Sequence, residues 1–524
     1  MGGPFPTRDL DRLVLPGRHR IVKIAQRATG GRFWQACAVA REISATNEIR
    51  ATYEINTWVW LAELSAAHGL PVTLGTVPDD VWDAVCLPGV DAVWLMGVWE
   101  RSPFAAGRDR ADAGRYAAVL DGFTPTDLVG SPYSVRRYVV DAHLGGPDGL
   151  AVARAALARR GVALVLDFVP NHVAPDHPWA ESTPEMFVAG TTDDLHADPN
   201  RFVATPTGTV VARGRDPYFP PWPDVAQLDV FSPLTRAAAA DTLAEIAAQC
   251  DVVRCDMAML ALSEVFGATW GRPAPPTEYW ADVFDVARHR FPHLAFWAEV
   301  YWGMEDRLLA LGFDACYDKV LYDRLTADDP AGVRTHLAGL AGNGARMIRF
   351  TENHDEPRAA AAFGPAARAA AVAVATLPGT TLWHDGQFEG RCVHVPVQVG
   401  RRPTEPIDEQ ARAFHHRLVH LARRIRSGTW TLAPVDGWPD DGSADRLLAW
   451  TWAGCDRRHV IVVNLTGERA TGRVRLPWSP PDGWTGVCED LLSGQRYEHD
   501  PAVVGAEGLF VDLDGRGFHV LTCG

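Results

Sequence analysis

The sequence predicts an α/β fold, a (β/α)8 barrel with an insertion after its third strand, followed by an antiparallel β-sandwich domain. Three observations support this prediction. Apolar strands alternate with helices over most of the chain, a long segment rich in proline and aromatic residues follows the third strand, and short strands with turns between them fill the C-terminal part. Continuous apolar strands between helices are typical of a parallel sheet that is covered on its faces. Eight such strands fit a closed barrel with insertions better than an open doubly wound sheet.

The eight predicted barrel strands follow one another in chain order. They lie in ATYEINTWVWL (51–61), GVDAVWLMGVW (89–99), VALVLDFVPNH (162–172), DVVRCDMAML (251–260), LAFWAEVYW (294–302), GFDACYDKV (312–320), MIRFTENHDEPR (347–358) and AVAVATLPGTTLWHDG (371–386). Alanine-rich segments at 148–161 and 234–250 predict two of the helices between them, since alanine is the strongest helix former.

Changes of composition along the chain predict the domain boundaries. We expect an N-terminal extension over residues 1–50, the barrel over 51–427 and the β-sandwich over 428–524. The insertion, residues 173–232, is rich in Pro, Asp and aromatic residues and leaves no room for a regular helix, so we expect a lid or small subdomain. Beyond residue 428, strands such as HVIVVNLTG alternate with Gly, Asp and Pro turns, as in antiparallel β domains.

The overall composition excludes several classes of partner. The net charge of -15 argues against nucleic acid and against an anionic membrane surface. No apolar run is long enough to cross a bilayer, so we expect no membrane partner. The N-terminus lacks the apolar segment of a secretory signal, and the 9 cysteines show no zinc-ligand spacing. We therefore expect reduced thiols, no structural disulfide and a cytoplasmic location.

Polar side chains gather at the C-terminal ends of the predicted strands, where the active sites of such barrels lie. These side chains are Asp167, Asn171, His172, Arg254, Asp256, Glu299, His354 and Asp355. Any one acid among them could be a structural ion pair or a helix cap. Three of these acids from three strands, Asp256, Glu299 and Asp355, with an arginine and two histidines, are instead what retaining glycoside hydrolysis requires. One carboxylate attacks the sugar carbon and one carboxylic acid protonates the leaving oxygen. A third carboxylate can favour the cationic transition state.

Four segments, DFVPNH, VRCDMAML, FWAEVYW and FTENHDEPR, occur in this order at strand ends, with supporting segments on the second and eighth strands. Through these segments, the chain between residues 52 and 425 resembles the α-amylase family of glycoside hydrolases and transglycosylases, whose members have a TIM barrel. The resemblance implies that Asp256 is the nucleophile, Glu299 the acid/base and Asp355 the transition-state stabiliser. It also implies that Arg254 keeps Asp256 ionised, because a nearby guanidinium lowers the pKa of a carboxyl group.

The resemblance implies further substrate-binding residues. His172 and His354 would donate hydrogen bonds to hydroxyls of the sugar at the cleaved bond, and Asp167 would brace that network. Tyr133, in GSPYSVRRY, occupies the place of a tyrosine that stacks under the same sugar.

The chain departs from the family pattern at several positions. Met259 and Leu260 replace a Lys-His pair that many members carry after the nucleophile. The histidine of that pair contributes to a calcium site, so we expect no required cofactor or metal, although Asn171 matches a frequent calcium-ligand position. His384 stands where a tyrosine is usual, and PYSVRR (132–137) replaces a motif with acidic residues. These changes indicate a divergent branch with a small or unusual acceptor.

The leading functional hypothesis is a retaining glycoside hydrolase that acts on α-glucosidic bonds in α-1,4-linked glucooligosaccharides or α-glucans. The alternative within the same chemistry is a transglycosylase or isomerase of small α-glucosides such as trehalose, maltose or sucrose, because only the acceptor differs after the covalent intermediate. The alternative from another class is a non-catalytic carbohydrate-binding protein, since a fold does not establish a function.

Overall fold

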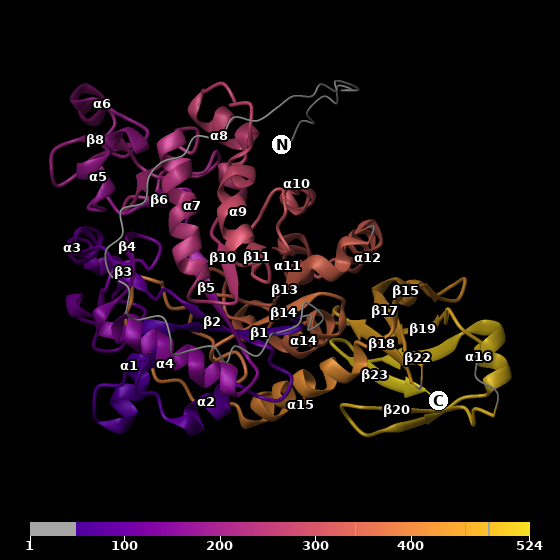
Figure 1. Cartoon of the computed structure of the whole chain (residues 1–524). Helices are drawn as coiled ribbons and strands as arrows, with labels where there is room; N and C mark the ends of the chain where they lie inside the picture. The colour runs from indigo at the N-terminus through magenta and orange to yellow at the C-terminus, as the bar shows by residue number, and fades with distance from the viewer. Residues whose placement is uncertain (1–48, 341, 456, 480–482, 524) are drawn as a thin grey trace. The chain divides into compact units, whose positions relative to one another are not determined.

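The computed structural model describes residues 49–340, 342–455, 457–479 and 483–523. The expected N-terminal extension of residues 1–50 lies outside the described residues, apart from Ile49 and Arg50. The larger part of the described chain is built on a closed barrel of parallel strands, in the order β1-β14-β13-β12-β11-β10-β5-β2 (Figure 1). A C-terminal antiparallel β domain follows it. The predicted fold class is therefore confirmed.

Each of the eight expected segments contributes one barrel strand. These strands are β1 (Ala51–Asn56), β2 (Ala92–Met96), β5 (Ala163–Phe168), β10 (Val252–Cys255), β11 (Ala295–Ala298), β12 (Ala315–Tyr317), β13 (Met347–Arg349) and β14 (Thr380–His384). Nearly every residue in them is buried, because the barrel interior and the surrounding helices cover both faces of the sheet. The continuous apolar strands of the sequence follow from this double burial.

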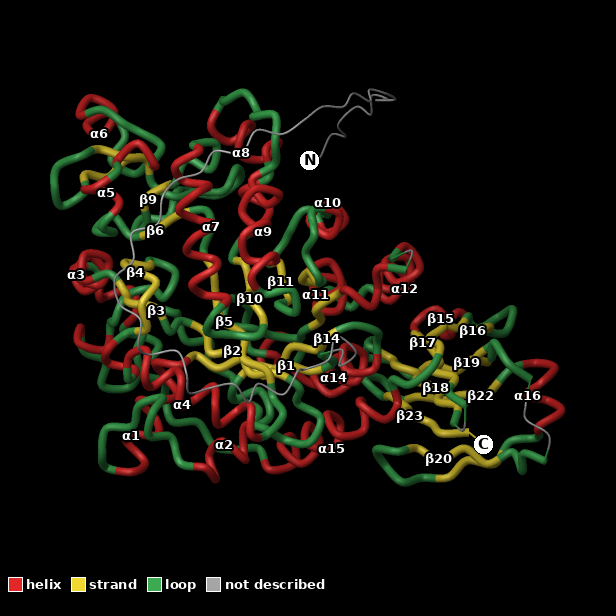
Figure 2. The backbone as a smooth tube through the Cα atoms, viewed as in Figure 1, coloured by secondary structure: helices red, strands yellow, loops and turns green. Residues whose placement is uncertain are grey.

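Helices surround the barrel (Figure 2). They are α1 (Thr57–His68), α2 (Asp79–Val85), α3 (Pro103–Ala111), α4 (Gly146–Arg159), α7 (Pro233–Ala247), α8 (Ser263–Trp270), α9 (Tyr279–Arg290), α10 (Glu305–Ala310), α11 (Lys319–Thr326), α12 (Pro330–Gly339), α13 (Ala359–Ala362), α14 (Ala367–Thr376) and α15 (Glu409–Ile425). Helix α14 is the most buried of them, because it lies between the barrel and the C-terminal domain. Trp450 and Trp452 of that domain donate indole N–H bonds to Thr376 Oγ1 (3.2 Å) and to Thr376 O (2.7 Å) at the end of α14.

The insertion after β5 has a small core of its own, which includes Met186 and Phe187. It contains β6 (His172–Val173), α5 (Trp179–Ser182), α6 (Thr192–Ala197), β7 (Phe202–Ala204), β8 (Val210–Ala212) and β9 (Ala226–Gln227), and β6 pairs with β9. The expectation that it leaves no room for a helix was wrong for two short helices. A capping box between Thr191 and Asp194 satisfies the first backbone N–H groups of α6, which allows so short a helix to form. A separate two-stranded antiparallel sheet of β3 (Trp99–Arg101) and β4 (Val135–Val140) precedes the insertion.

The C-terminal domain consists of two antiparallel sheets. One has the order β15-β17-β18-β23-β20-β21 and the other β16-β19-β22, and they share a hydrophobic core. The strands are β15 (Thr429–Ala433), β16 (Val435–Asp436), β17 (Leu447–Ala453), β18 (Arg458–Asn464), β19 (Ala470–Val474), β20 (Val487–Asp490), β21 (Arg496–Glu498), β22 (Leu509–Leu513) and β23 (Phe518–Cys523), with helix α16 (Pro501–Glu507) before β22.

A disulfide joins Cys488 and Cys523 in this domain, so the expectation of no structural disulfide was wrong. The two residues are 35 positions apart in sequence but lie directly opposite each other on β20 and β23, with Cα atoms 4.5 Å apart. That separation is typical of a cross-strand pair and is within the range for a disulfide. Reduced cysteines were one of the observations behind the expected cytoplasmic location, and the disulfide removes that support. In the part of the chain that the structure describes, no helix is long and apolar enough to cross a membrane.

Candidate active site

Asp256, Glu299 and Asp355 line one cavity of about 350 Å³ at the C-terminal ends of the barrel strands. Tyr133 and His172 line the same cavity, so five of the eight predicted catalytic and substrate-binding residues face a common space. The other three are Asp167, Arg254 and His354, which are buried and contact the lining residues, as the distances below show. The insertion contributes Asp216, Phe219, Trp222 and Asp224 to the cavity lining, so part of it lies against this site.

The parallel pairing of β10 and β11 places Asp256 and Glu299 side by side. Each residue directly follows the last paired residue of its strand, since Cys255 lies opposite Ala298. The Glu299 N–H donates to Cys255 O (3.0 Å), which continues the ladder past the end of β11. Parallel strands in register therefore carry both carboxylates to the same level of the barrel.

Arg254 lies beneath the acids and is fully buried inside the barrel. Its Nη1 donates to Asp256 Oδ1 (2.8 Å) and to Asp167 Oδ1 (3.4 Å), and its Nη2 lies 2.7 Å from Glu299 Oε2 as an ion pair. One cation is thus shared among three carboxyl groups. Burial raises the pKa of Asp256 and the Arg254 charge lowers it, and burial has the larger effect. In the free protein, Arg254 therefore aims Asp256 and limits the rise in its pKa.

Glu299 is held by three groups. The Tyr301 hydroxyl donates to Glu299 Oε1 (2.7 Å), the Met257 backbone N–H donates to Oε2 (2.7 Å), and Arg254 lies beside Oε2. Burial raises the pKa of Glu299 to about 7, against the opposing charge of Arg254. A carboxyl group that keeps its proton close to neutral pH is suited to act as a general acid.

Asp355 and His354 form a pair with opposite charges. The Asp355 side chain is 47% exposed, and its Oδ2 lies 3.1 Å from His354 Nε2. Burial raises the pKa of Asp355, but the charge of His354 and its hydrogen bond lower that pKa more, to about 2. His354 Nε2 also lies 2.8 Å from the Tyr133 hydroxyl oxygen, and the two rings stack with centroids 5.2 Å apart. Near neutral pH, where Glu299 can still hold its proton, Asp355 is therefore an anion.

The roles that the resemblance implies for Asp167 and His172 toward a bound sugar stay predictions. Asp167 accepts a hydrogen bond from Trp94 Nε1 (3.0 Å) and contacts Arg254, and among the described residues it has no hydrogen bond to either His172 or His354. His172 lines the cavity with its ring centroid 5.2 Å from that of Trp222, and burial lowers the pKa of His172 to about 4. Asp167 supports the floor of the site through Arg254, and His172 is a neutral hydrogen-bonding group.

The surroundings of Asn171 do not fit a calcium ion. Its Oδ1 accepts a hydrogen bond from Gln227 Nε2 (2.9 Å), and its Nδ2 lies near Gln227 Oε1 (3.3 Å) and His172 Nδ1 (3.2 Å). Calcium prefers several carboxylate and carbonyl oxygens, whereas the partners of this amide are the Gln227 amide and a histidine nitrogen. The described residues also contain no group of three or more His, Cys, Asp or Glu side chains that could hold a metal.

Several polar residues that contact the predicted site were not identified from the sequence, among them Tyr301 and Glu54. Tyr301 lies two residues after Glu299, and its position beyond a strand end was a usable signal. Glu54 lies inside β1 and its Oε1 is 2.5 Å from His354 Nδ1. In the sequence, Glu54 stands out only as an acid in the middle of an apolar strand, and this pattern does not identify His354 as its partner.

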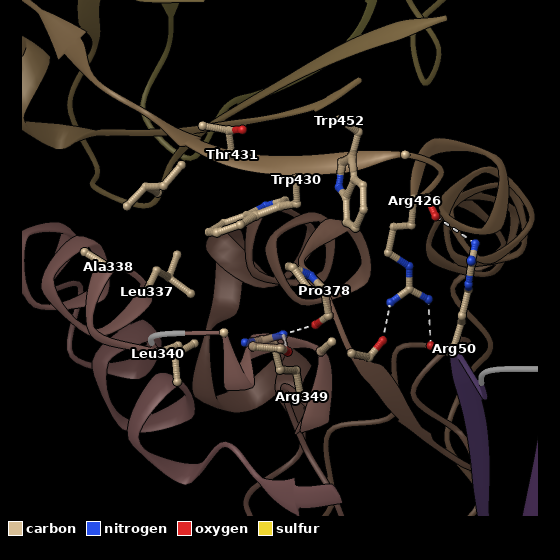
Figure 3. Close-up of a pocket in the computed structure, with 16 residues that line it drawn as sticks. Arg50, Leu337, Ala338, Leu340, Arg349, Pro378, Arg426, Trp430, Thr431 and Trp452 are labelled. Carbon is tan, nitrogen blue, oxygen red and sulfur yellow. Dashed lines mark hydrogen bonds between the residues drawn. The ribbon is translucent and has the colours of Figure 1, made fainter. Parts of the chain in front are cut away.

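A second, larger cavity of about 790 Å³ lies between α12, the segment before β14 and strands β15 and β17 (Figure 3). Among the described residues that line it there is no Asp or Glu. Its arginines donate to backbone carbonyls: Arg349 Nη1 to Gly344 O (3.1 Å), Arg426 Nη1 to Gly379 O (2.7 Å) and Arg50 Nη1 to Arg426 O (2.7 Å). Its described lining also has no His or Cys, whereas three carboxyl groups meet in the smaller cavity, so the smaller cavity is the candidate active site.

Comparisons with known proteins agree with the family that the sequence resembles. No family model matches the chain. The chain is 28% identical over 421 residues to alpha-amylase MalA of Haloarcula japonica, which covers 78% of this chain and 53% of that protein. It therefore spans about half the length of that relative. Among solved structures, the alpha-amylase of H. orenii matches with a TM-score of 0.63 and 17% identity, covering 90% of this chain and 99% of that one. The alpha-amylase of Geobacillus thermoleovorans in complex with acarbose matches with a TM-score of 0.62 and 17% identity, covering 91% and 98%.

The fold is thus that of the α-amylases, a (β/α)8 barrel with an inserted subdomain and a C-terminal β domain. The resemblance to the α-amylase family of glycoside hydrolases, predicted from four short segments, is confirmed by the sequence relative, and the solved structures share the fold. The chain is consistent with a divergent member of that family.

Proposed function

We propose that this chain is a retaining glycoside hydrolase that acts on α-glucosidic bonds of α-1,4-linked glucooligosaccharides or α-glucans. The observation that carries the proposal is the convergence of Asp256, Glu299 and Asp355 on one cavity that also has Tyr133 and His172 in its lining. A sequence relative named as an alpha-amylase supports the substrate class.

In the proposed mechanism, Asp256 attacks the anomeric carbon from one side of the sugar. Glu299, whose pKa burial raises to about 7, gives its proton to the leaving glycosidic oxygen. The covalent glycosyl-enzyme then forms, and Glu299, now a carboxylate, removes a proton from the attacking water. Two inversions at the same carbon give a product with the starting α configuration. Asp355, an anion beside His354, stabilises the positive charge that develops on the sugar ring in both steps.

The substrate is tested with a panel of maltooligosaccharides, sucrose, trehalose and isomaltose, followed by proton NMR of the first product. We expect hydrolysis of maltooligosaccharides with an α-configured first product. A β-configured first product would contradict the retaining mechanism. Transfer of the glucosyl unit to a sugar, with little release to water, would make the chain a transglycosylase or isomerase of small α-glucosides. Binding without turnover of any of them would favour the non-catalytic alternative.

The roles of the two central acids are tested with substrates that differ in their leaving group. Glu299→Gln should cripple turnover of natural sugar leaving groups, whose oxygens need protonation, but should still react with an α-glucosyl fluoride. Azide needs no general base, so it should rescue the second step of this variant and give an α-glucosyl azide. Equal and unrescued loss in folded Asp256→Asn and Glu299→Gln proteins would contradict the assigned roles.

A further inference from the structure

Glu54 is a buried acid that neither the predicted motifs nor the proposed mechanism uses. It lies in the middle of β1, is fully buried, and is paired in register with Trp94 of β2 and His384 of β14. Its Oε2 has no hydrogen-bond partner among the described residues. An uncompensated carboxylate in the interior is costly, so the contact made by its other oxygen determines what it does there.

That contact is with His354. Glu54 Oε1 lies 2.5 Å from His354 Nδ1, and 300 positions of sequence separate the two residues. On the opposite edge of the ring, His354 Nε2 lies 3.1 Å from Asp355 Oδ2 and 2.8 Å from the Tyr133 hydroxyl. The imidazole therefore lies between two carboxyl groups, one deep in the barrel and one in the cavity.

This arrangement favours hydrogen on both ring nitrogens. An ionised carboxylate only accepts hydrogen bonds, so a nitrogen that faces one is best satisfied as a donor. Neutral imidazole has a single N–H; if that N–H faces Glu54, Nε2 can accept from the Tyr133 hydroxyl but also directs its lone pair toward Asp355 Oδ2, 3.1 Å away. Imidazolium satisfies both contacts at once.

The surrounding charges favour the same state. The ionisable groups that interact with His354 or with its partners through charge or hydrogen bonds also include Asp167, Arg254, Asp355, Tyr133, His384 and His394. Burial lowers the pKa of His384 to about 3, so this neighbour is neutral. The carboxylates around His354 thus outnumber the arginine. Although burial lowers the pKa of His354, the charges of Asp355 and Glu54 raise it well above its usual value.

We propose that Glu54 is a positioning residue of this active site, whose buried carboxylate holds His354 as an imidazolium with its Nε2–H directed at Asp355. The protonation of His354 by this arrangement does not depend on the proposed function. Only the consequence for catalysis rests on that function. Glu54 does not touch the cavity. It acts through His354, which in turn keeps Asp355 ionised and fixed in place for the transition state.

The first test measures the protonation of His354 directly and requires no activity. Protein with isotope-labelled histidine is titrated by NMR, and the His354 ring signals are assigned by their loss in His354→Gln. In the wild type we expect these signals to stay in the imidazolium position through pH 8. In Glu54→Gln the glutamine carbonyl can still accept from Nδ1–H but carries no charge, so His354 should titrate below pH 8. Glu54→Asp keeps the charge, so its His354 should stay protonated to a higher pH than in Glu54→Gln.

A matched control is Glu352→Gln. Glu352 is an equally buried acid after β13, but it faces Arg358 (3.1 Å) and His384 (3.2 Å) instead of His354. We expect this variant to leave the His354 titration unchanged. Should Glu54→Gln fail to fold, the wild-type and Glu54→Asp titrations still decide the question. A wild-type His354 that loses its proton below pH 7, or a folded Glu54→Gln protein with the wild-type titration, would overturn the proposal.

The second test measures the catalytic consequence. If the chain hydrolyses α-glucosides, Glu54→Gln should lower kcat/KM at pH 6 by about 10- to 100-fold, the usual cost of removing a group that orients a site residue. Glu54→Asp should recover part of this loss. The activity of Glu54→Gln then depends on the protonation of both His354 and Glu299. Its kcat/KM should therefore fall more steeply with rising pH than that of the wild type. Absence of hydrolysis by the wild type would count against the proposed function alone, since the NMR titration would still test the role of Glu54.

Discussion

The hydrogen bond between Tyr301 and Glu299 gives a prediction with a definite sign. The Tyr301 hydroxyl donates to Glu299 Oε1 (2.7 Å), and this bond stabilises the ionised carboxylate and so lowers the pKa of Glu299. In Tyr301→Phe the bond is lost while the ring remains. The anion is then less stable, the pKa of Glu299 rises, and the general acid keeps its proton to higher pH.

The size of the shift follows from the strength of the lost bond. A hydrogen bond to a charged group contributes about 1.5 kcal/mol at the low end of its range. The low end applies because Met257 N–H and Arg254 still hold Oε2. One pKa unit corresponds to about 1.4 kcal/mol, so the pKa of Glu299 should rise by about one unit from its value of about 7. At pH 8 the protonated fraction then increases from about one-tenth to about one-half, which is a fivefold gain.

The assay is the pH dependence of kcat/KM on a maltooligosaccharide, which reports the free enzyme. Wild-type kcat/KM should fall about tenfold between pH 6 and pH 8, because Glu299 must be protonated to act. The midpoint of this fall should move up by about one pH unit in Tyr301→Phe. The matched control is Tyr116→Phe, which removes a hydroxyl that contacts Arg115 and Asp109 instead of the cavity. Its profile should be that of the wild type.

An unchanged midpoint in folded Tyr301→Phe, or a midpoint that moves to lower pH, would refute this reasoning. The first result would mean that Glu299 does not set the basic limb or that the bond is absent in solution. The second would mean that the space left by the hydroxyl admits water, which stabilises the carboxylate better than Tyr301 does.

Three further predictions concern the nucleophile, the disulfide and calcium. Asp256→Asn should lower kcat by about 10⁴-fold or more for every leaving group, including an α-glucosyl fluoride, since no covalent intermediate can form; a loss confined to poor leaving groups would contradict this. Reduction of the Cys488–Cys523 disulfide should lower the free energy of unfolding of the C-terminal domain by about 2–4 kcal/mol. Thiol titration of the denatured protein should find two fewer free groups before reduction than after it, and equal counts would show that the disulfide is absent. A chelator should leave both the Tm and the activity unchanged, because Gln227 already engages the Asn171 oxygen; a lower Tm that calcium restores would show that a metal binds.

The barrel and the general position of its acids were predictable from the sequence because both depend on local rules. A strand that is buried on both faces is expected to be mostly apolar, and Ala92–Met96 shows this as clearly in the sequence as in the structure. Parallel strands in a barrel end at a common face, so Asp256 and Glu299 had to lie near each other once each followed a strand. No knowledge of packing was needed for either inference.

The pKa shifts of the acids were not predictable in this way. The sequence indicated that the Arg254 charge lowers the pKa of Asp256, and it does, but burial has the larger and opposite effect, so this pKa lies above its usual value. Burial depends on how completely the barrel and the insertion exclude water. A short sequence segment does not contain that information. The contacts of Asp167 were likewise not predictable from the sequence: it accepts a hydrogen bond from Trp94 Nε1 and contacts Arg254.

What the sequence by itself determined is the order of the strands, the residue that follows each of them and therefore the chemistry available at the barrel mouth. What only the tertiary structure decided is which distant residues meet. Glu54 and His354 come together because closure of the barrel places β1 beside β14, which itself pairs with β13. Cys488 and Cys523 come together because β20 pairs with β23 in one register and not in another. The physical reason is the same in both cases: a strand's sequence specifies which of its faces is buried, while its partner and register are set by the collective packing of the whole sheet.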